Sequence, residues 1–483
     1  MNIYVNPGNA SFQRALNSDI YIDKTGLIAA ANTRIGKNNC YLCVSRPRRF
    51  GKSMAADMLA AYYSKGCDSA SLFEGMKAEQ EESFRIHLNR HNVIRLDIQR
   101  FLESEKDLNT FIDEIERRVI AELMEGFPEC KGISPDNRLK VVLDAIFNQT
   151  GNGFIFIIDE WDCVFRIAKE REDIQKNYLD FLRGLFKGSD YVELAYMTGI
   201  LPVKKYGDHS AINIFREFSM LSPKGLAEYF GFTAEEVRSL CAKYHIDYDE
   251  TQKWYDGYRL GNLHIYNPQA VIELMESSQF NSYWTGTETY EALKIYIDQD
   301  FDGLKQAVIE MLGNVHYKID PSTSQNDMTT FKTKDDILTL LVHLGYLAFD
   351  ETEKEVFIPN QEITQEFIRA VKVGGWEGLT DALECSERLL HSTRKLDEDP
   401  VMELPSGKGL ADVVYLPRRD ANCPALVIEL KWNKSAQGAI AQIKSKQYVS
   451  WIEGYVGDIL LVGINYHAKT KKHECVIERY VKK

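Results

Sequence analysis

The sequence contains no uncharged apolar run that approaches 18 residues, so a membrane-spanning helix is not expected. Glycine and proline are also scarce, at 31 and 13 of 483 residues, which excludes fibrous and low-complexity classes of protein. The first 24 residues lack a basic start followed by an apolar core, so they do not predict a signal peptide. These absences predict a cytoplasmic globular protein of several domains, without a membrane partner.

Cysteine and histidine show no pattern of a metal site. The nine cysteines are scattered, and Cys40 and Cys43 are the one close pair. Their spacing can belong to a metal or redox site, but no second pair follows, so reduced thiols in the core are the better interpretation. None of the ten histidines has the spacing of a ligand set.

The formal net charge of −13 argues against a protein coated with nucleic acid. The charge is uneven, however. Residues 401–483 contain 13 Lys and Arg against 8 Asp and Glu, a net of +5, which leaves −18 on residues 1–400. A basic C-terminal module can face a polyanion such as DNA, and it can equally be a solvated surface without a partner.

The first half of the chain alternates strand-like and helix-like segments. Continuous apolar runs bounded by turns are typical of buried strands in a parallel sheet that helices cover on both faces. The expected strands are Cys40–Ser45, Asn92–Ile98, Phe154–Ile158 and Glu193–Gly199, and the clearest helices are Ser53–Tyr63 and Leu108–Leu123.

After about residue 223 the pattern becomes mostly helical. Thr233 and Glu236 have the spacing of a capping box at the start of one helix. A helix over Lys334–Leu344, stopped by Gly345 and followed by a hairpin, resembles a winged helix. The predicted domains are a P-loop ATPase domain over 1–223, a helical segment over 224–325, a winged-helix-like segment over 326–375 and an α/β domain over 380–483.

Residues 46–53 read R-P-R-R-F-G-K-S, close to the phosphate loop G-x-x-x-x-G-K-[ST], with Arg46 in place of the first glycine. Gly51 lets the backbone approach a ligand, Lys52 would reach the outer phosphates, and the Ser53 hydroxyl would bind Mg²⁺. Taken alone, the tripeptide is also compatible with a solvated surface turn. Arg46, with its two neighbouring arginines, can contact phosphates, another subunit or acidic residues of the same domain.

Two later segments favour nucleotide binding over a chance match. The apolar strand ending at Ile158 is followed by Asp159 and Glu160, as in a Walker B motif, although the pair alone is also typical of a helix cap. Asp159 would hold Mg²⁺ and Glu160 would polarise the attacking water. Thr198 ends another core strand, where it can sense the terminal phosphate. ATP and Mg²⁺ are therefore the expected cofactors.

The C-terminal segment contains a second acidic pattern. Asp412 lies early on one strand-like run, and Glu429 and Lys431 lie on the next, where positions i and i+2 share a face. If the strands pair, Asp412 and Glu429 can hold Mg²⁺, and Lys431 can orient the attacking water. The pattern is short, and alone it is better explained by charges on an edge strand. A following helix that carries Gln442 supports the site.

The ordered set of motifs resembles bacterial AAA-ATPase-like proteins with a C-terminal PD-(D/E)XK nuclease-superfamily domain. The set is YIDKTGLI, SRPRRFGKS, FIIDEWD, MTGILPVKKYG, WYDGY, YNP, LGYL and IPN, and it covers nearly the whole chain. The resemblance implies a P-loop NTPase sheet, a helical and winged-helix-like middle, and a restriction-endonuclease-like α/β domain. It also implies nuclease-superfamily residues at Asp412, Glu429, Lys431 and Gln442.

The chain departs from this family in one place, because the stretch before Asp412 is shorter than in other members. This difference puts DNA cleavage in doubt more than it does the nuclease-like fold. The first hypothesis is an ATP-regulated or ATP-driven, metal-dependent nuclease acting on DNA. The second is a nucleotide-switched interaction protein with an inactive nuclease fold, and the third is an ATPase with a structural C-terminal domain. The sequence leaves oligomerisation open.

Overall fold

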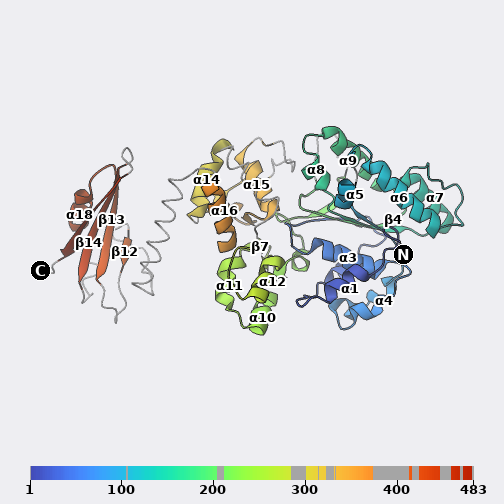
Figure 1. The fold of residues 1–483 in the computed structure, drawn as a ribbon, viewed down its shortest axis with the longest axis horizontal. Helices are drawn as coiled ribbons and strands as arrows, with labels where there is room; N and C mark the ends of the chain where they lie inside the picture. The colour runs from blue at the N-terminus through green and yellow to red at the C-terminus, as the bar shows by residue number, and fades with distance from the viewer. Residues whose placement is uncertain are drawn as a thin grey trace. The chain divides into compact units, whose positions relative to one another are not determined.

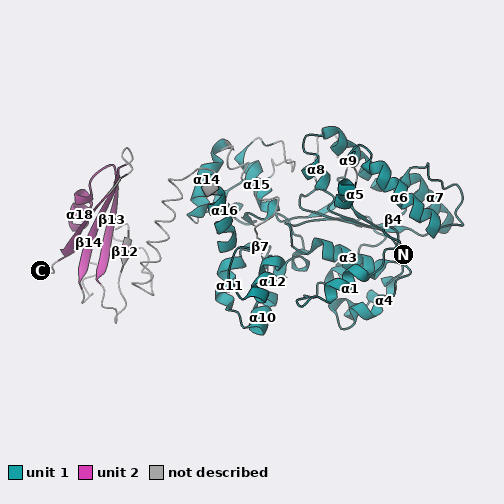
Figure 2. Ribbon diagram, viewed as in Figure 1, with its two compact units in different colours: residues 1–375 teal, residues 376–483 magenta. Residues whose placement is uncertain are grey.

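A computed structural model describes most of the chain. The described residues are 2–104, 107–203, 212–283, 301–313, 315–321, 331, 333–373, 413–415, 424–445, 458–467 and 472–480. The chain divides into two compact units, residues 1–375 and 376–483, which Figure 2 colours separately. Each unit is described by itself.

The first unit is built on a five-stranded parallel sheet in the order β2-β3-β4-β1-β5. Its strands are β1 (Tyr41–Ser45), β2 (Asn92–Asp97), β3 (Phe154–Asp159), β4 (Val192–Gly199) and β5 (Arg216–Phe218). All six residues of β3 are buried, because helices cover both faces of the sheet (Figure 1). The continuous apolar run of β3 is the pattern that a strand covered on both faces requires, and the predicted parallel sheet is confirmed.

Nine helices of the described residues surround this sheet. They are α1 (Ala10–Leu16), α2 (Gly26–Asn32), α3 (Lys52–Tyr63), α4 (Phe84–His87), α5 (Ile98–Ser104), α6 (Phe111–Gly126), α7 (Leu139–Thr150), α8 (Cys163–Ile167) and α9 (Glu172–Phe186). The predicted strand Asn92–Ile98 is one residue too long, because Ile98 already begins α5. The helix predicted over Leu108–Leu123 begins three residues later, after its N-cap residue Thr110.

The middle of the chain contains a small sheet that the helical interpretation missed. Its strands are β6 (Phe232–Thr233), β7 (Tyr258–Leu260) and β8 (Leu263–Tyr266), which pack with α10 (Ala234–Tyr244), α11 (Tyr248–Tyr255) and α12 (Pro268–Ser277). Gly261 and Asn262 join β7 to β8, and a glycine–asparagine pair between alternating apolar residues is a hairpin signal. The capping box of Thr233 and Glu236 is present at the start of α10, as predicted.

The predicted helix and hairpin before residue 375 are confirmed. The elements are α14 (Leu304–Leu312), β9 (Tyr317–Lys318), α15 (Lys334–Leu344), β10 (Ala348–Asp350), β11 (Glu355–Phe357) and α16 (Gln361–Val373). Gly345 ends α15 with a φ of 87°, a left-handed conformation that glycine adopts without strain. The domain boundaries drawn from the sequence stay a prediction.

The second unit contains a four-stranded sheet and one described helix. The strands are β12 (Val413–Tyr415), β13 (Ala425–Trp432), β14 (Ile459–His467) and β15 (Lys472–Tyr480), in that order, and the helix is α18 (Ala436–Ser445). β12 pairs antiparallel with β13, which is the strand pairing on which the proposed site of Asp412 and Glu429 depends. Ile440 and Ile443 of α18 pack on Val427 and Leu461 to form a separate core.

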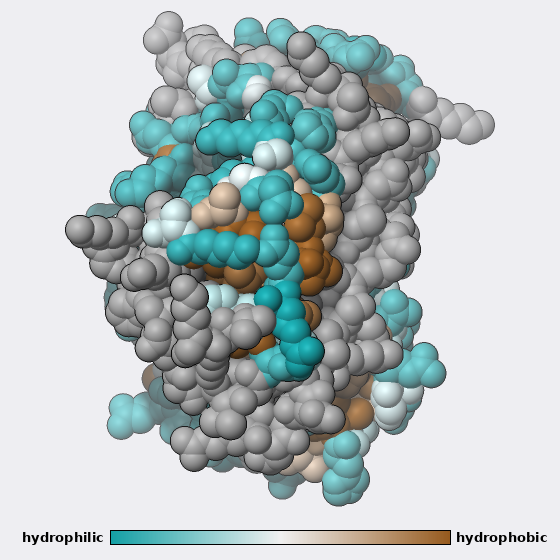
Figure 3. Space-filling model, turned by 90° about the vertical axis from the view of Figure 1, so that its left-hand side faces the viewer, coloured by the Kyte–Doolittle hydropathy of each residue, from teal (hydrophilic) through white to brown (hydrophobic). Residues whose placement is uncertain are grey.

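Apolar side chains also reach the surface of the molecule, as Figure 3 shows for the face that it draws. In the second unit the exposed ones include Trp432 at 64% and Ile477 at 60% of their full accessibility. Within the described residues, no helix combines the length and the apolar character needed to cross a membrane.

Candidate functional site

The loop between β1 and α3 has the backbone of a phosphate-binding turn. β1 ends at Ser45, and α3 begins at Lys52 after the N-cap residue Gly51. Gly51 has a φ of 82°, a conformation in which any other residue except asparagine or aspartate is strained. Ser53 is exposed on the first turn of α3. The unpaired N–H groups of a helix N-terminus favour an anion at this place.

Lys52 lies among the acidic residues that follow β3. Its side chain is buried, and its Nζ donates a hydrogen bond to the carbonyl oxygen of Pro47 at 3.0 Å. Burial lowers the pKa of Lys52, and the nearby carboxylates of Glu160 and Asp159 act in the opposite direction. The structure therefore brings together two motifs that lie about a hundred residues apart in sequence.

Asp159 and Thr198 meet at the carboxyl ends of neighbouring strands. β4 lies between β1 and β3, so Thr198 on β4 stands between the phosphate loop and Asp159. The Thr198 hydroxyl donates a hydrogen bond to Asp159 Oδ1 at 3.4 Å, and both side chains are buried. This places the predicted sensing threonine beside the predicted magnesium ligand.

Glu160 occupies a left-handed backbone conformation with a φ of 52°. Its N–H donates to Asp159 Oδ1 at 3.0 Å, and its side chain forms an ion pair with Arg166. Burial raises the pKa of Glu160, whereas Lys52 and Arg166 act to lower it. Non-glycine residues in this conformation cost free energy and cluster at functional sites.

Sequence reasoning missed two acidic residues at the same edge of the sheet. Asp162 is fully buried, and its carboxylate accepts hydrogen bonds from the backbone N–H groups of Ile200 and Leu201. Asp97 ends β2 and is the register partner of Asp159 on β3. Because the carboxyl ends of parallel strands meet at one edge of the sheet, an aspartate one residue before the end of the predicted strand 92–98 was the signal that could have identified Asp97.

Arg46, which replaces the first glycine of the loop, is fully buried. Its Nη1 donates to the carbonyl oxygens of Ser45 and Phe218, each at 2.8 Å, and its guanidinium lies 5.5 Å from the centre of the Phe230 ring. Arg49 contacts the carbonyl oxygen of Tyr283 at 3.0 Å. These arginines attach the loop to later parts of the chain, and a contact between Arg46 and a nucleotide stays a prediction.

In the second unit, three of the predicted residues lie together. Glu429 is 2% exposed on β13. Its Oε1 accepts hydrogen bonds from Lys431 Nζ at 2.7 Å and from Gln442 Nε2 on α18. Among the described residues, Glu429 Oε2 has no hydrogen-bond partner although it is buried. Asp412, the fourth predicted residue, lies outside the described residues.

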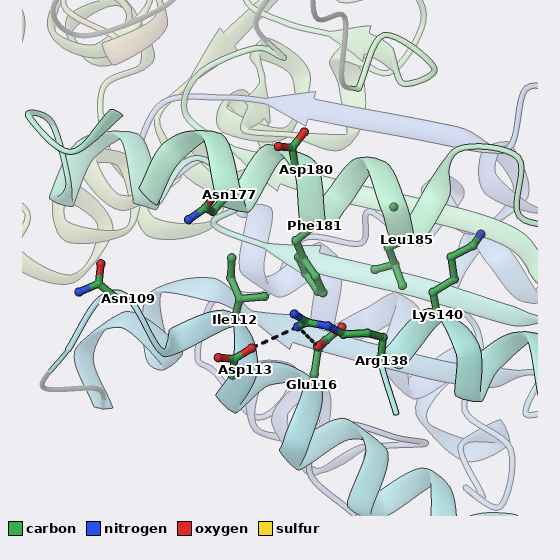
Figure 4. A pocket seen from close by; sticks show the side chains of 11 residues that line it. Asn109, Ile112, Asp113, Glu116, Arg138, Lys140, Asn177, Asp180, Phe181 and Leu185 are labelled. Carbon is green, nitrogen blue, oxygen red and sulfur yellow. Dashed lines mark hydrogen bonds and ion pairs between the residues drawn. The ribbon is translucent and has the colours of Figure 1, made fainter. Parts of the chain in front are cut away.

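Candidate metal ligands and one large cavity can be compared with the phosphate loop. Within the part of the chain that the structure describes, no group of three or more His, Cys, Asp or Glu side chains is placed to hold a metal ion. A cavity of about 500 Å³ lies along α6 and α9 (Figure 4), and its lining includes no residue of the phosphate loop. There Arg138 forms ion pairs with Asp113 and Glu116, so these three side chains neutralise part of the charge in the lining.

Comparison with known proteins gives a family match within the first unit. Residues 8–207 match a family described as predicted AAA-ATPase. A curated relative, an uncharacterized protein in the vnfD 5' region of Azotobacter chroococcum mcd 1, is 27% identical over 284 residues. The match covers 56% of this chain and 51% of that relative, so the chain spans about half the length of the relative.

Two solved structures resemble the chain at low TM-scores. The Walker-type ATPase PABY2304 of Pyrococcus abyssi has a TM-score of 0.34 and 12% identity, over 71% of this chain and 94% of that one. The ORC2 protein of Aeropyrum pernix, in ADPNP–ADP complexes, has a TM-score of 0.26 and 11% identity, over 76% and 98% of the two chains. Residues 8–207 are therefore similar to an AAA-ATPase-like family, and they form an α/β fold in which a parallel sheet carries the phosphate loop.

Proposed function

We propose that the first unit binds ATP with Mg²⁺ at the phosphate loop and hydrolyses it. The observation that carries this proposal is the position of Lys52, whose side chain is buried at the start of α3, close enough to Asp159 and Glu160 for their charges to act on it. A buried lysine beside two carboxylates at the start of a helix is suited to an anionic ligand that arrives with a cation.

Each residue of the proposed site has a separate task. Lys52 would exchange the Pro47 carbonyl oxygen for phosphate oxygens, while Ser53 and Asp159 would hold Mg²⁺, which neutralises charge on the phosphates. Glu160 would accept a proton from the attacking water, and Thr198 would contact the terminal phosphate. The N–H groups at the start of α3 would bind the remaining phosphate oxygens.

Replacing Lys52 with alanine tests the nucleotide site. Loss of a charge-assisted contact of about 1.5–3 kcal/mol should weaken ATP binding by roughly 10- to 100-fold. The control is Lys37→Ala, because Lys37 is exposed and its Nζ contacts the carbonyl oxygen of Thr33 instead. Calorimetric titration with ATP and Mg²⁺ gives the dissociation constants, and equal values for both variants would exclude this site.

The second part of the proposal is that residues 380–483 are a nuclease-like domain that cuts DNA with Mg²⁺. Its support is Glu429, a buried carboxylate whose Oε1 is fixed by Lys431 and Gln442 while Oε2 is unpaired within the described residues. Unpaired buried carboxylate oxygens are costly, and a metal ion would satisfy this one. Asp412 would be the second ligand: it directly precedes Val413, which pairs with Ile428.

Cleavage of plasmid DNA with Mg²⁺ or Mn²⁺, with and without ATP, tests this part. Glu429→Gln should abolish cutting and leave ATP affinity unchanged, since the two sites lie in different units. Glu478→Gln on β15 is the control, because Glu478 pairs with Lys444 outside the proposed site. If the wild-type chain cuts no DNA under any condition while it binds ATP, the alternative of a nucleotide-switched interaction protein replaces the nuclease.

A further inference from the structure

The turn after β3 is held rigidly against β4. The backbone N–H of Trp161 donates to the Thr198 carbonyl oxygen at 3.0 Å, and the Asp162 carboxylate accepts the backbone N–H of Leu201 at 2.9 Å. A Cβ atom on Gly199 would lie 2.4 Å from Asp162 Oδ1, so this glycine is required for the close approach. The backbone of Glu160 is therefore fixed in its left-handed conformation by contacts on its C-terminal side.

The side chain of Glu160 is directed by Arg166, which lies six residues later on α8. Arg166 pairs with Glu160 Oε2, and its Nε lies 3.6 Å from Asp162 Oδ2. The exposed fractions are 11% for Arg166, 19% for Glu160 and 0% for Asp162, so the guanidinium bridges two carboxylates that have little contact with water. Because backbone N–H groups hold Asp162, Arg166 has a fixed anchor from which to hold Glu160.

We infer that Arg166 is a positioning residue for ATP hydrolysis, acting through Glu160. This inference rests on the proposed function of the first unit. Arg166 engages Oε2, and Oε1 is then the carboxylate oxygen that can accept a proton from water. One guanidinium nitrogen contacts Glu160 Oε2 while Nε lies 3.6 Å from Asp162 Oδ2, so the position of the Glu160 carboxylate is restrained relative to Asp162. Such positioning of a reacting group lowers the barrier of the chemical step without changing ground-state binding.

The inference predicts an effect on turnover and not on binding. Arg166→Ala should lower kcat for ATP hydrolysis by about 10- to 100-fold, within the usual contribution of a positioned base. The KM for ATP and the dissociation constant should stay within about twofold of wild type, since the ion pairs of Arg166 described above are with Glu160 and Asp162, which are not assigned to ATP binding. Arg166→Lys, which keeps the charge without the planar fork, should recover part of the loss.

A double-mutant cycle separates positioning from a general structural role. If Arg166 acts through Glu160, then Arg166→Ala added to Glu160→Gln should cause no further loss of kcat. A variant that damages folding would instead lower kcat in both backgrounds. Arg183→Ala on α9 is the matched control, because Arg183 is 47% exposed and lies 3.9 Å from Asp180, away from Glu160.

Each outcome decides the inference. If Arg166→Ala does not fold, the same cycle is run with Arg166→Lys, for which we expect a smaller loss of kcat that again disappears in the Glu160→Gln background. Wild-type kcat in Arg166→Ala, or losses that multiply in the double variant, would overturn the positioning role while leaving ATP hydrolysis intact. A wild-type chain that neither binds nor hydrolyses ATP would overturn the proposed function itself.

Discussion

At the scale of single residues, the phosphate loop has the buried cation Arg46 at the position where the G-x-x-x-x-G-K-[ST] pattern has its first glycine. Burial lowers the pKa of Arg46 to about 10. Two of its nitrogens, Nε and Nη2, have no hydrogen-bond partner among the described residues. His343 on α15 is close enough for the charge of Arg46 to act on it, so the loop and α15 share a buried polar junction. A buried cation without a carboxylate is costly, which makes the junction sensitive to further charge.

His343 predicts a pH dependence of stability. Burial, and secondarily Arg46, lowers the pKa of His343 from 6.5 to about 4. The unfolded chain therefore takes up a proton at His343 before the folded chain does, and stability from this group is lost as pH falls from about 6.5 to 4. The loss should total about 3 kcal/mol.

Urea denaturation between pH 7 and 4.5 measures this effect. His343→Leu should remove the corresponding part of the pH dependence, although it also changes packing at every pH. His245→Asn is the control, because His245 is exposed and asparagine tolerates its left-handed φ of 58°. If the free energy of unfolding changes with pH in the same way for wild type and His343→Leu, then His343 is not a neutral, buried histidine in the folded protein.

At the scale of elements, the WYDGY segment joins the middle of the chain to α15. The Tyr258 hydroxyl donates to the Gly345 carbonyl oxygen, and its ring meets the Phe50 ring of the phosphate loop with centroids 5.5 Å apart. The interpretation of this aromatic cluster as core is confirmed, since Tyr255 and Tyr258 are both buried. Gly257 has a φ of 119° and packs against the backbone of Pro359.

Gly257→Ala should destabilise the first unit strongly. A Cβ atom there would lie 2.0 Å from the Pro359 carbonyl oxygen, so the two segments would have to separate. We expect a loss of at least about 3 kcal/mol, against about 1 kcal/mol for Gly261→Ala, which has a φ of 62° and no atom near its would-be Cβ. Chemical denaturation of the two variants checks the difference, and similar midpoints would show that the contact with Pro359 yields easily.

At the scale of the whole molecule, each unit has its own hydrophobic core. A large core of the first unit extends across the parallel sheet and its helices, and the phosphate loop, Asp159 and Thr198 all lie in this unit. The core of the second unit lies between its sheet and α18. A separate core is the condition for a domain to fold independently.

A chain that ends at residue 375 should therefore fold and bind ATP with an affinity within about twofold of the full chain. Titration with ATP and the thermal unfolding of both chains measure this. Aggregation of the shortened chain would show that the first unit does not fold alone. Loss of ATP affinity after proper folding would show that the nucleotide site depends on residues beyond 375.

Local chemistry was enough to predict several parts of this protein from the sequence. These parts depend on spacing within a few residues. They are Gly51 and Lys52 after a strand, the acid pair after Ile158, the hairpin before residue 375, and the pair of Glu429 with Lys431. Backbone conformation and strand periodicity act at that range, so the pattern carries the information. The short hairpin over 258–266 was missed because its aromatic residues were interpreted only as core.

Tertiary structure alone decided which of these parts meet. The placement of β4 between β1 and β3, which brings Thr198 to Asp159, depends on packing of the whole sheet. The burial of Arg46 likewise depends on a segment distant in sequence, because Arg46 donates to the Phe218 carbonyl oxygen. The ion pairs of Arg166 with Glu160 and Asp162 are close in sequence, but they depend on the direction in which the side chains point. The local sequence pattern does not predict such contacts, because they contribute free energy only when the chain has folded and brought the residues together.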